Sequence, residues 1–288
     1  MKQYLDLVKY VLENGKRKVN RTGVATISCF SCFYRVDLAE GYPLLTTKKI
    51  FFNSMLHELL WYLSGDEHIR NLRKHTKIWD AWADSEGRLE TAYGRFWRRF
   101  PVPEKGLDGE AWSESRWISR DSETGEKVFD QIEYLIDSLK EVKKDPHSSA
   151  LRRLVVSAWH PGNASASLLP PCHYTFCFNV TDGKLNCHLT QRSADIALGV
   201  PFNLACYSLL TMMLAKECGF EPGEFAHTLI DAHIYENHIE GLKQQLERAP
   251  GKLPSVQIAD KPFNALEFED FTLLGYNPQP VIKFEVAV

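Results

Sequence analysis

The sequence lacks the features of a chain that crosses a membrane or is exported through one. Its longest apolar runs fall well short of the ~18 residues that a spanning helix needs, and the opening MKQYLDLVKY contains no secretory hydrophobic region. The seven cysteines are odd in number and follow no spaced framework of the kind that disulfide-rich proteins have. These absences predict a cytoplasmic protein in a reducing compartment, with no membrane partner.

An excess of charge of either sign is also absent. The 34 lysines and arginines stand against 37 acidic residues, which gives a net charge of −3. So weak a field argues against general binding to nucleic acids or acidic membranes, and no basic stripe with interleaved aromatic residues supports RNA binding. RNA binding stays possible but unsupported, and an anionic ligand would have to be held by a few positioned arginines.

The sequence does contain enough apolar material for a large core, since 44% of its residues are hydrophobic and 12% are aromatic. Hydrophobic spacing predicts helices over residues 1–14, 53–64, 129–144, 202–217 and 233–247. Runs of β-branched and aromatic residues predict strands over 24–38, 154–159 and the C-terminal VIKFEVAV, and a hairpin over 173–191 that turns at Asp182-Gly183. We expect a single α+β domain over 1–288, with residues 101–127 as a variable surface loop.

Cys172, in the segment LLPPCHY, is a candidate nucleophile. The two prolines fix a rigid turn before a β-rich run, and a thiol at such a junction reacts when neighbouring groups favour the thiolate. The alternative is that it is a small buried packing residue, as most cysteines are. We assign that packing role to Cys29 and Cys32, which have the spacing of a redox pair but lie in an alternating strand rather than at a helix N-terminus. We assign it also to Cys187, because Cys187-His188 has no second pair to complete a zinc site.

Arginines and one acid are the other groups with chemical potential. Arg192 and Ser193, in QRSAD, suit a phosphate through a planar fork and a short donor. The pair Arg152-Arg153 and Arg21 could serve likewise, although paired arginines are more often solvated surface. Glu58 lies in the apolar segment HELLWYL, where a carboxyl group must either form a salt bridge or titrate upward towards acid/base work.

The chain contains, in this order, the segments LLTTKK, HELLWYLSGD, IWDAWAD, AYGRFW, RRLVVSAWHP, LPPCHY, QRSADIALGVPFN, DAHIYENHIE and GYNPQPVIKFEVAV. This order of segments resembles that of the folate-dependent thymidylate synthase family. The resemblance covers essentially the whole length outside residues 101–127, and QRS-D…LG-PFN combined with P-C-H is its most specific part. It implies an α+β fold in which a mixed β-sheet packs with helices and one face of the sheet forms the interface of a homodimer.

The resemblance implies reductive methylation of dUMP to dTMP by a methyltransferase, through a covalent bond between Cys172 and C6 of the base. It implies that protons are moved by Glu58, Tyr93, Asn203 and His173. The substrate residues would be Arg21, Arg192 and Ser193 at the phosphate, Arg152 and Arg153 from the partner subunit, and His233 and Tyr235 at the sugar. Within the family Asn203 accompanies uracil, so dUMP is favoured over dCMP.

The co-substrate implied by the resemblance is 5,10-methylenetetrahydrofolate, with no metal. Asp195 would hydrogen-bond it, and the carboxylate of Val288 would help to close the site and exclude water. The full set of matching positions is Ile78, Trp79, Trp82, Leu169, Asp195, Phe202 and Val288.

A few positions depart from the family pattern. Ala25 and Ile230 stand where glycine is usual, Glu90-Thr91 replaces Gly-Pro, and Ala197 replaces a larger residue. A β-branched residue can replace glycine only where φ is negative, so Ile230 is expected to reshape its segment.

These departures leave two alternatives open beside the synthase. One is a dUMP hydroxymethylase, in which water completes the reaction to give 5-hydroxymethyl-dUMP and tetrahydrofolate. The other is a catalytically silent paralogue that binds a nucleotide or RNA. The retained Trp79 and Trp82 and the terminal VAV, which are expected to exclude water, favour the synthase.

Overall fold

The computed structural model describes residues 1–89, 92–106, 108–111, 113, 115–122, 124–167 and 169–286. The chain divides into two compact units. Unit 1 comprises Met1–Leu56 and Phe178–Val288, and unit 2 comprises His57–Cys177. The chain passes from unit 1 to unit 2 within helix α2 (Phe52–Ser64) and returns within strand β7 (His173–Thr181). The single domain expected over 1–288 stays a prediction.

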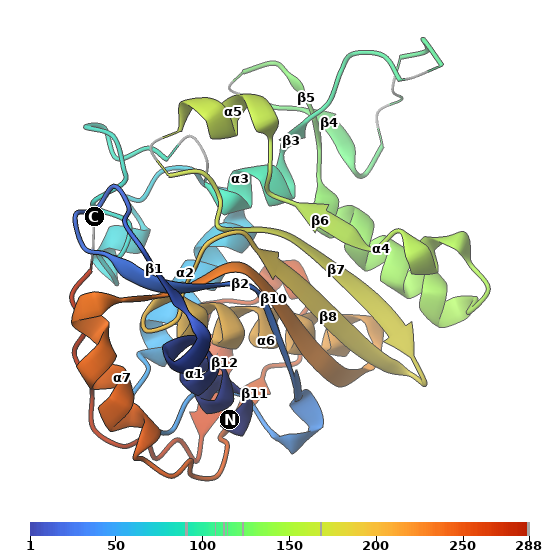
Figure 1. Cartoon of the computed structure of the whole chain (residues 1–288). Helices are drawn as coiled ribbons and strands as arrows, with labels where there is room; N and C mark the ends of the chain where they lie inside the picture. The colour runs from blue at the N-terminus through green and yellow to red at the C-terminus, as the bar shows by residue number, and fades with distance from the viewer. Residues whose placement is uncertain are drawn as a thin grey trace. The chain divides into compact units, whose positions relative to one another are not determined.

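Unit 1 is built on a mixed sheet, as expected from the resemblance. Its strands follow the order β1 (Lys16–Lys18), β2 (Thr26–Asp37), β10 (Glu221–Tyr235), β8 (Lys184–Gln191) and then β7, while β9 (Ala194–Asp195) pairs with β10. Strand β10 is antiparallel to β2 and parallel to β8 and β9. In Figure 1 it lies between β2 and β8. Strand β10 is therefore the long central strand of the sheet, and the end of β8 lies beside its middle.

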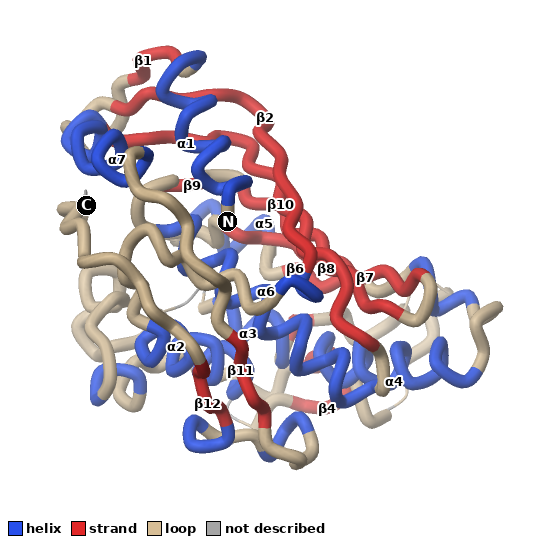
Figure 2. The backbone as a smooth tube through the Cα atoms, turned by 90° about the horizontal axis from the view of Figure 1, so that it is seen from below, coloured by secondary structure: helices blue, strands red, loops and turns tan. Residues whose placement is uncertain are grey.

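The helices of unit 1 pack on this sheet (Figures 1 and 2). Helix α1 (Lys2–Asn14) contacts β2, and α6 (Gly199–Cys218) contacts β10 and β8. All residues of α6 from 204 to 211 are buried, so two turns of this helix have no exposed face, and it ends at Gly219 with φ +74°. Helix α7 (Ile239–Leu246) contacts α1, and β11 (Ser255–Ile258) pairs with β12 (Phe271–Leu274).

Unit 2 combines helices with short strands. Helix α4 (Gln131–Lys144) packs on α3 (Tyr93–Arg98) and on β6 (Val155–Ser157), which is antiparallel to the first part of β7. The carboxylate of Asp130 accepts hydrogen bonds from two N–H groups in the first turn of α4, which fixes where the helix begins. Helix α5 covers Pro161–Ala166. In the described residues of both units, short 3-10 helices cover Leu38–Glu40, Leu72–Lys74, Ser149–Arg152, Glu236–His238, Phe263–Ala265 and Phe268–Asp270.

The structure confirms the hairpin and most of the predicted elements. Asp182 and Gly183 have φ values of 51° and 74°, the positive values that a two-residue turn needs to match the twist of its strands. The helices over 1–14, 53–64, 129–144 and 202–217 and the strands over 24–38 and 154–159 are present, with ends shifted by a few residues. Among the described residues, no helix is both long and apolar enough to span a membrane.

One predicted helix begins later than predicted, one predicted strand is wrong, and residues 101–127 contain strands that were not predicted. Residues 233–235 extend β10, where Tyr235 pairs with Thr26, so the following helix begins only at Ile239. Residues 281–286 form no strand, although their composition favours one, because strands need a partner. Residues 101–127 are mostly exposed in their described part, but they contribute to an antiparallel sheet of β3 (Phe100–Pro101), β5 (Lys127–Phe129) and β4 (Ile118–Arg120). Strands of two or three residues are too short to give a periodic signal.

Candidate active site

Cys172 lies at the end of the proline-rich turn, directly before β7 in unit 2. Its backbone N–H donates to the hydroxyl of Tyr93 at 2.8 Å, and its Sγ lies 4.0 Å from the carbonyl oxygen of Pro170. The residue is half-buried. The prolines and the tyrosine thus hold the backbone from two sides while the thiol keeps partial access to solvent, which is what a nucleophile requires.

Tyr93 and His173 form a stacked pair next to this cysteine. Their rings are 3.8 Å apart and nearly parallel, at 2°, and the Tyr62 ring lies 5.2 Å from that of Tyr93. Burial lowers the pKa of His173 to about 3, so this imidazole is neutral at physiological pH. A neutral imidazole can relay a proton or accept a hydrogen bond, but it supplies no positive charge to a thiolate.

Glu58 is buried on α2 and is held by an indole. Its Oε1 accepts a hydrogen bond from Nε1 of Trp79 at 2.7 Å. Burial raises the pKa of Glu58 to about 7, although hydrogen bonds from Tyr62 and Trp79 act in the opposite direction. A carboxyl group with this pKa can both give and take a proton near neutral pH, so the acid/base interpretation of Glu58 is the one that its surroundings support.

The remaining candidates of unit 2 are a group of half-buried apolar residues and a pair of exposed arginines. The Trp79 ring packs edge-on against Trp82 at 5.8 Å and against Tyr93 at 6.0 Å. Ile78, Trp79, Trp82 and Leu169 are all half-buried. Arg152 and Arg153 are exposed, and within the described part of the chain no ion pair or hydrogen bond engages either guanidinium.

In unit 1, Arg192 and Ser193 occupy the turn between β8 and β9. The carbonyl of Arg192 accepts from the N–H of Asp231 at 3.3 Å, and the carbonyl of Ser193 accepts from Nε2 of Gln191 at 2.9 Å. Both turn residues are half-buried, so their side chains have access to a ligand. Arg21 is exposed between β1 and β2.

Asp195 caps the turn that leads into α6. Its Oδ1 accepts from the N–H groups of Ala197 and Leu198 at 2.9 and 3.2 Å. Phe202 and Asn203 follow near the start of α6, and both are half-buried. Ala197, which stands where the family has a larger residue, is buried in this turn. Its carbonyl accepts a hydrogen bond from Nζ of Lys48 at 2.5 Å.

His233 and Tyr235 end strand β10. Nδ1 of His233 lies 3.1 Å from the carbonyl of Asp231, and the rings of His233 and Tyr235 are 5.4 Å apart. Hydrogen bonds from His233, Lys18 and Ser28 hold the pKa of Asp231 well below its usual value, against the effect of burial. Ile230 has no positive φ, so a β-branched residue fits there without backbone strain, while Ser31, at the facing position of β2, has φ 58°.

The structure thus groups the candidates within each unit. Glu58, Trp79, Tyr93, Cys172 and His173 form one connected set. Arg192, Ser193 and Asp195 are neighbours in the sequence between β8 and α6. Glu90, Thr91 and Val288 lie outside the described residues.

Sequence reasoning missed Lys48. It lies in a stretch, residues 42–48, that is buried throughout, and its Nζ lies 4.5 Å from the Phe284 ring centre. Burial lowers its pKa to about 8, with Asp195 acting in the opposite direction. The signal in the sequence was a lysine in a segment whose other residues are apolar or carry hydroxyl groups.

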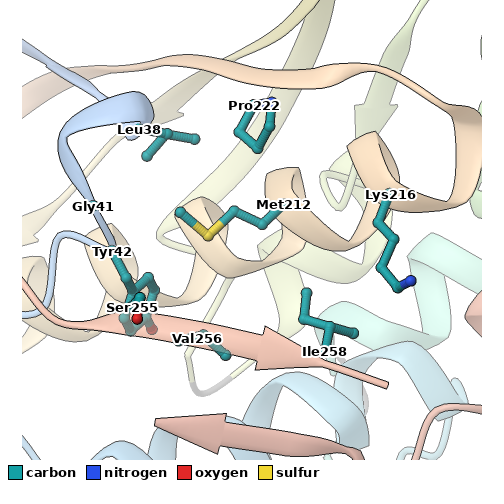
Figure 3. Close-up of a pocket in the computed structure, with 9 residues that line it drawn as sticks. All are labelled: Leu38, Gly41, Tyr42, Met212, Lys216, Pro222, Ser255, Val256 and Ile258. Carbon is teal, nitrogen blue, oxygen red and sulfur yellow. The ribbon is translucent and has the colours of Figure 1, made fainter. Parts of the chain in front are cut away.

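The candidate residues do not line the pocket drawn in Figure 3. This pocket of unit 1 has a volume of about 300 Å³ and is mainly apolar, with Met212, Val256 and Ile258 in its wall and Lys216 beside them. Nζ of Lys216 is engaged by Asp260 at 3.0 Å. Across the described residues, no group of three or more His, Cys, Asp or Glu side chains could hold a metal ion.

Comparison with known proteins identifies the family. The family model described as thymidylate synthase matches residues 2–288. A thymidylate synthase of Haloferax volcanii is 48% identical over 337 aligned residues, which cover 98% of this chain and 95% of that protein. Since both matches extend over nearly the full length, the chain belongs to the thymidylate synthase family and is a methyltransferase.

Proposed function

We propose that Cys172 is the nucleophile with which this enzyme converts dUMP to dTMP. Its thiolate would add to C6 of the base, which makes C5 a carbon nucleophile, and the Cys172–C6 bond would break again when the product leaves. Methylenetetrahydrofolate would supply the one-carbon unit and the hydride, and would leave as dihydrofolate. The observation that carries the proposal is the position of Cys172 at the end of a rigid turn, with its N–H bound to Tyr93.

Proton transfer would be the work of Glu58 with Tyr93, His173 and Asn203. C5 must lose a proton after it has gained the one-carbon unit, and the folate nitrogen must gain one. The pKa of Glu58, about 7, suits a group that does both at neutral pH. The neutral His173, stacked on Tyr93, would orient the phenol and the waters that it binds.

Substrate binding would use the arginines of unit 1 and those of a second subunit. Arg21, Arg192 and Ser193 would hold the phosphate, His233 and Tyr235 would bind the sugar 3′-hydroxyl, and Asn203 would read uracil through its amide. Arg152 and Arg153 would reach the phosphate of the partner subunit. Their exposure, without a partner among the described residues, supports this role.

A homodimer through the sheet is part of the same proposal. Phe30 and Phe33 on β2 are 85% and 51% exposed, and large exposed aromatic side chains on a sheet face favour burial against a second copy. The folate would be bound by Ile78, Trp79, Trp82, Leu169, Asp195, Phe202 and Val288, as the family resemblance implies. The half-buried indoles of Trp79 and Trp82 supply flat apolar surfaces for its ring system.

One incubation tests the reaction. The purified enzyme is mixed with dUMP and methylenetetrahydrofolate, and both nucleotide and folate are identified by mass spectrometry. We expect dTMP with dihydrofolate. Hydroxymethyl-dUMP with tetrahydrofolate would instead identify a hydroxymethylase, and unchanged dUMP with retained binding would identify a silent paralogue.

Mixing two inactive variants tests the shared site. We expect Cys172→Ser and Arg153→Ala each to lose most activity, and we expect activity to return when the two are co-refolded. Recovery follows because one mixed dimer contains a site with both native residues. No recovery, although mixed dimers form, would contradict a role for Arg153 in the partner's site.

A further inference from the structure

Three buried polar side chains of unit 1 form a continuous series of hydrogen bonds across neighbouring strands. The hydroxyl of Tyr34 on β2 lies 2.9 Å from Nδ1 of His227 on β10. Nε2 of His227 lies 3.0 Å from Oε1 of Gln191, the last residue of β8. Nε2 of Gln191 donates to the carbonyl of Ser193 at 2.9 Å. The three side chains belong to residues that are 6%, 0% and 3% exposed, so water does not compete for these bonds.

The Ser193 end fixes the direction of every bond in this network. A carbonyl oxygen only accepts, so the Gln191 amide must present Nε2 to Ser193 and Oε1 to His227. Oε1 also only accepts, and His227 therefore carries its proton on Nε2. Nδ1 of His227 is then an acceptor, and the hydroxyl of Tyr34 donates to it. One tautomer and one amide orientation satisfy the whole network.

The register of the sheet explains why these residues meet. Tyr34 and His227 are direct partners in the antiparallel pairing of β2 with β10, and Gln191 pairs with Leu229 in the parallel pairing of β8 with β10. Side chains two residues apart on a strand share a face, so His227 and Leu229 face the same side as Gln191. The network therefore connects the middle of β2 to the turn that follows β8.

We propose that Tyr34 and His227 are positioning residues that set, through Gln191, the conformation of the turn at Arg192 and Ser193. On its other side this turn is held by the Asp231 N–H through the longer, 3.3 Å bond to Arg192. Binding of a phosphate by a guanidinium depends on the direction of its planar fork, so a small rotation of the turn weakens it. The inference rests on the proposed role of Arg192 and Ser193 at the phosphate, and extends it to residues buried behind the turn.

Calorimetric titration of Tyr34→Phe with dUMP and with deoxyuridine tests the proposal. The variant removes one hydroxyl and keeps the ring. We expect the Kd of dUMP to rise about fivefold, the effect typical of one lost buried hydrogen bond, while the Kd of deoxyuridine is unchanged because it has no phosphate. Tyr42→Phe is the matched control, since the hydroxyl of the buried Tyr42 donates to the Ala205 carbonyl at 3.0 Å in the same unit. This control should change neither Kd.

Two variants of His227 add a rescue. His227→Leu removes both ring nitrogens, whereas His227→Gln supplies one acceptor and one donor in their place. We expect the glutamine to restore most of the dUMP affinity that the leucine loses. Wild-type dUMP affinity in both Tyr34→Phe and His227→Leu would overturn the proposal, and so would an equal loss of affinity for dUMP and deoxyuridine.

Arg192→Lys separates this inference from the function on which it rests. If that variant leaves the ratio of the two affinities unchanged, the assignment of Arg192 to the phosphate fails. If it lowers the preference for dUMP while Tyr34→Phe does not, the phosphate site stands and the positioning role is wrong.

Discussion

His238 donates from Nε2 to the backbone carbonyl of Glu285 at 2.7 Å, and its Nδ1 lies 3.9 Å from Oδ1 of Asp195. The imidazole is completely buried. Because the carbonyl only accepts, the proton must be on Nε2. A single side chain therefore fixes the segment near the C-terminus and faces the acid that caps the turn before α6.

Replacing His238 should release that segment. We expect His238→Leu to speed hydrogen exchange of the amides in residues 282–286 by about fivefold, the effect of losing one hydrogen bond, and to raise the KM for the folate. His238→Gln keeps an N–H donor and should behave more like the wild type. Unchanged exchange in the leucine variant would mean that other contacts hold the segment.

The nucleophile assignment predicts that Cys172→Ser lowers kcat by at least about a thousandfold, because a hydroxyl is a far weaker nucleophile than a thiolate. Binding of dUMP should be largely intact. The control is Cys177→Ser, which changes a half-buried cysteine five residues along the same segment and should keep near-normal turnover. Substantial turnover by the Cys172 variant would refute the assignment.

Glu58 should make the stability of the fold depend on pH. Its pKa is about 7 in the folded protein against an ordinary value of 4.5, so the folded state binds more protons between these values. The associated stability is fully present below pH 4.5 and is lost as the pH rises through 7.

Urea unfolding of wild type and Glu58→Gln at pH 5 and pH 8 measures this loss. The wild type should lose about 2 to 3 kcal/mol more than the variant over that interval, from a pKa difference of about 2.5. Glu13→Gln, at the exposed end of α1, should show no such difference from the wild type. Parallel pH dependences of wild type and Glu58→Gln would contradict the raised pKa.

His173 should remain neutral throughout the range of an activity assay. Burial lowers its pKa from 6.5 to about 3, so the stability linked to its neutral form is present above pH 6.5 and is lost as the pH falls towards 3. Nitrogen-15 NMR of the histidines, assigned with a His173→Asn variant, should find no titration of this ring between pH 4.5 and 8. A titration midpoint of the His173 ring within that range would show that the ring becomes charged under the conditions of the activity assay.

Asn203→Asp should improve the acceptance of dCMP relative to dUMP, by about tenfold or more in the ratio of kcat/KM values. A protonated carboxyl can donate and accept where cytosine requires it, whereas the amide matches uracil. Phe202→Leu, at the neighbouring position, tests whether any change near the start of α6 has the same effect. An unaltered base preference in Asn203→Asp would mean that this residue does not read the base.

Elements whose residues carry their own local signal were predictable from the sequence. The turn at Asp182-Gly183 follows from two residues that tolerate positive φ, and α4 follows from one stripe of apolar residues at helical spacing. Residues 233–235 were misassigned because their apolar spacing fits a helix, while their actual conformation is set by pairing with β2. Such pairing joins residues some 200 positions apart, and local periodicity contains no information about it.

The same distinction applies to the candidate site. Cys172, Arg192 and Glu58 could be singled out because their residue types are unusual in their segments. The positions of Tyr34 and His227 in a hydrogen-bond network could not be predicted, because each depends on a partner distant in sequence: His227 for Tyr34 and Gln191 for His227. Lys48 had a local signal, but its bond to the Ala197 carbonyl is visible only in the folded protein. The broken alternation of β2 at Ser31, which buries both Cys29 and Cys32, is likewise visible only in the folded strand.

The burial of helix α6 has a consequence for how this protein is inactivated by heat. A helix buried on every side for two turns exposes a largely apolar surface as soon as the sheet that it packs on opens, and such surfaces associate with one another faster than the chain can refold. Heat inactivation should therefore be irreversible, with an apparent Tm that rises with the scan rate. The lifetime of the enzyme at high temperature is then set by the rate at which α6 is uncovered and not by an equilibrium constant.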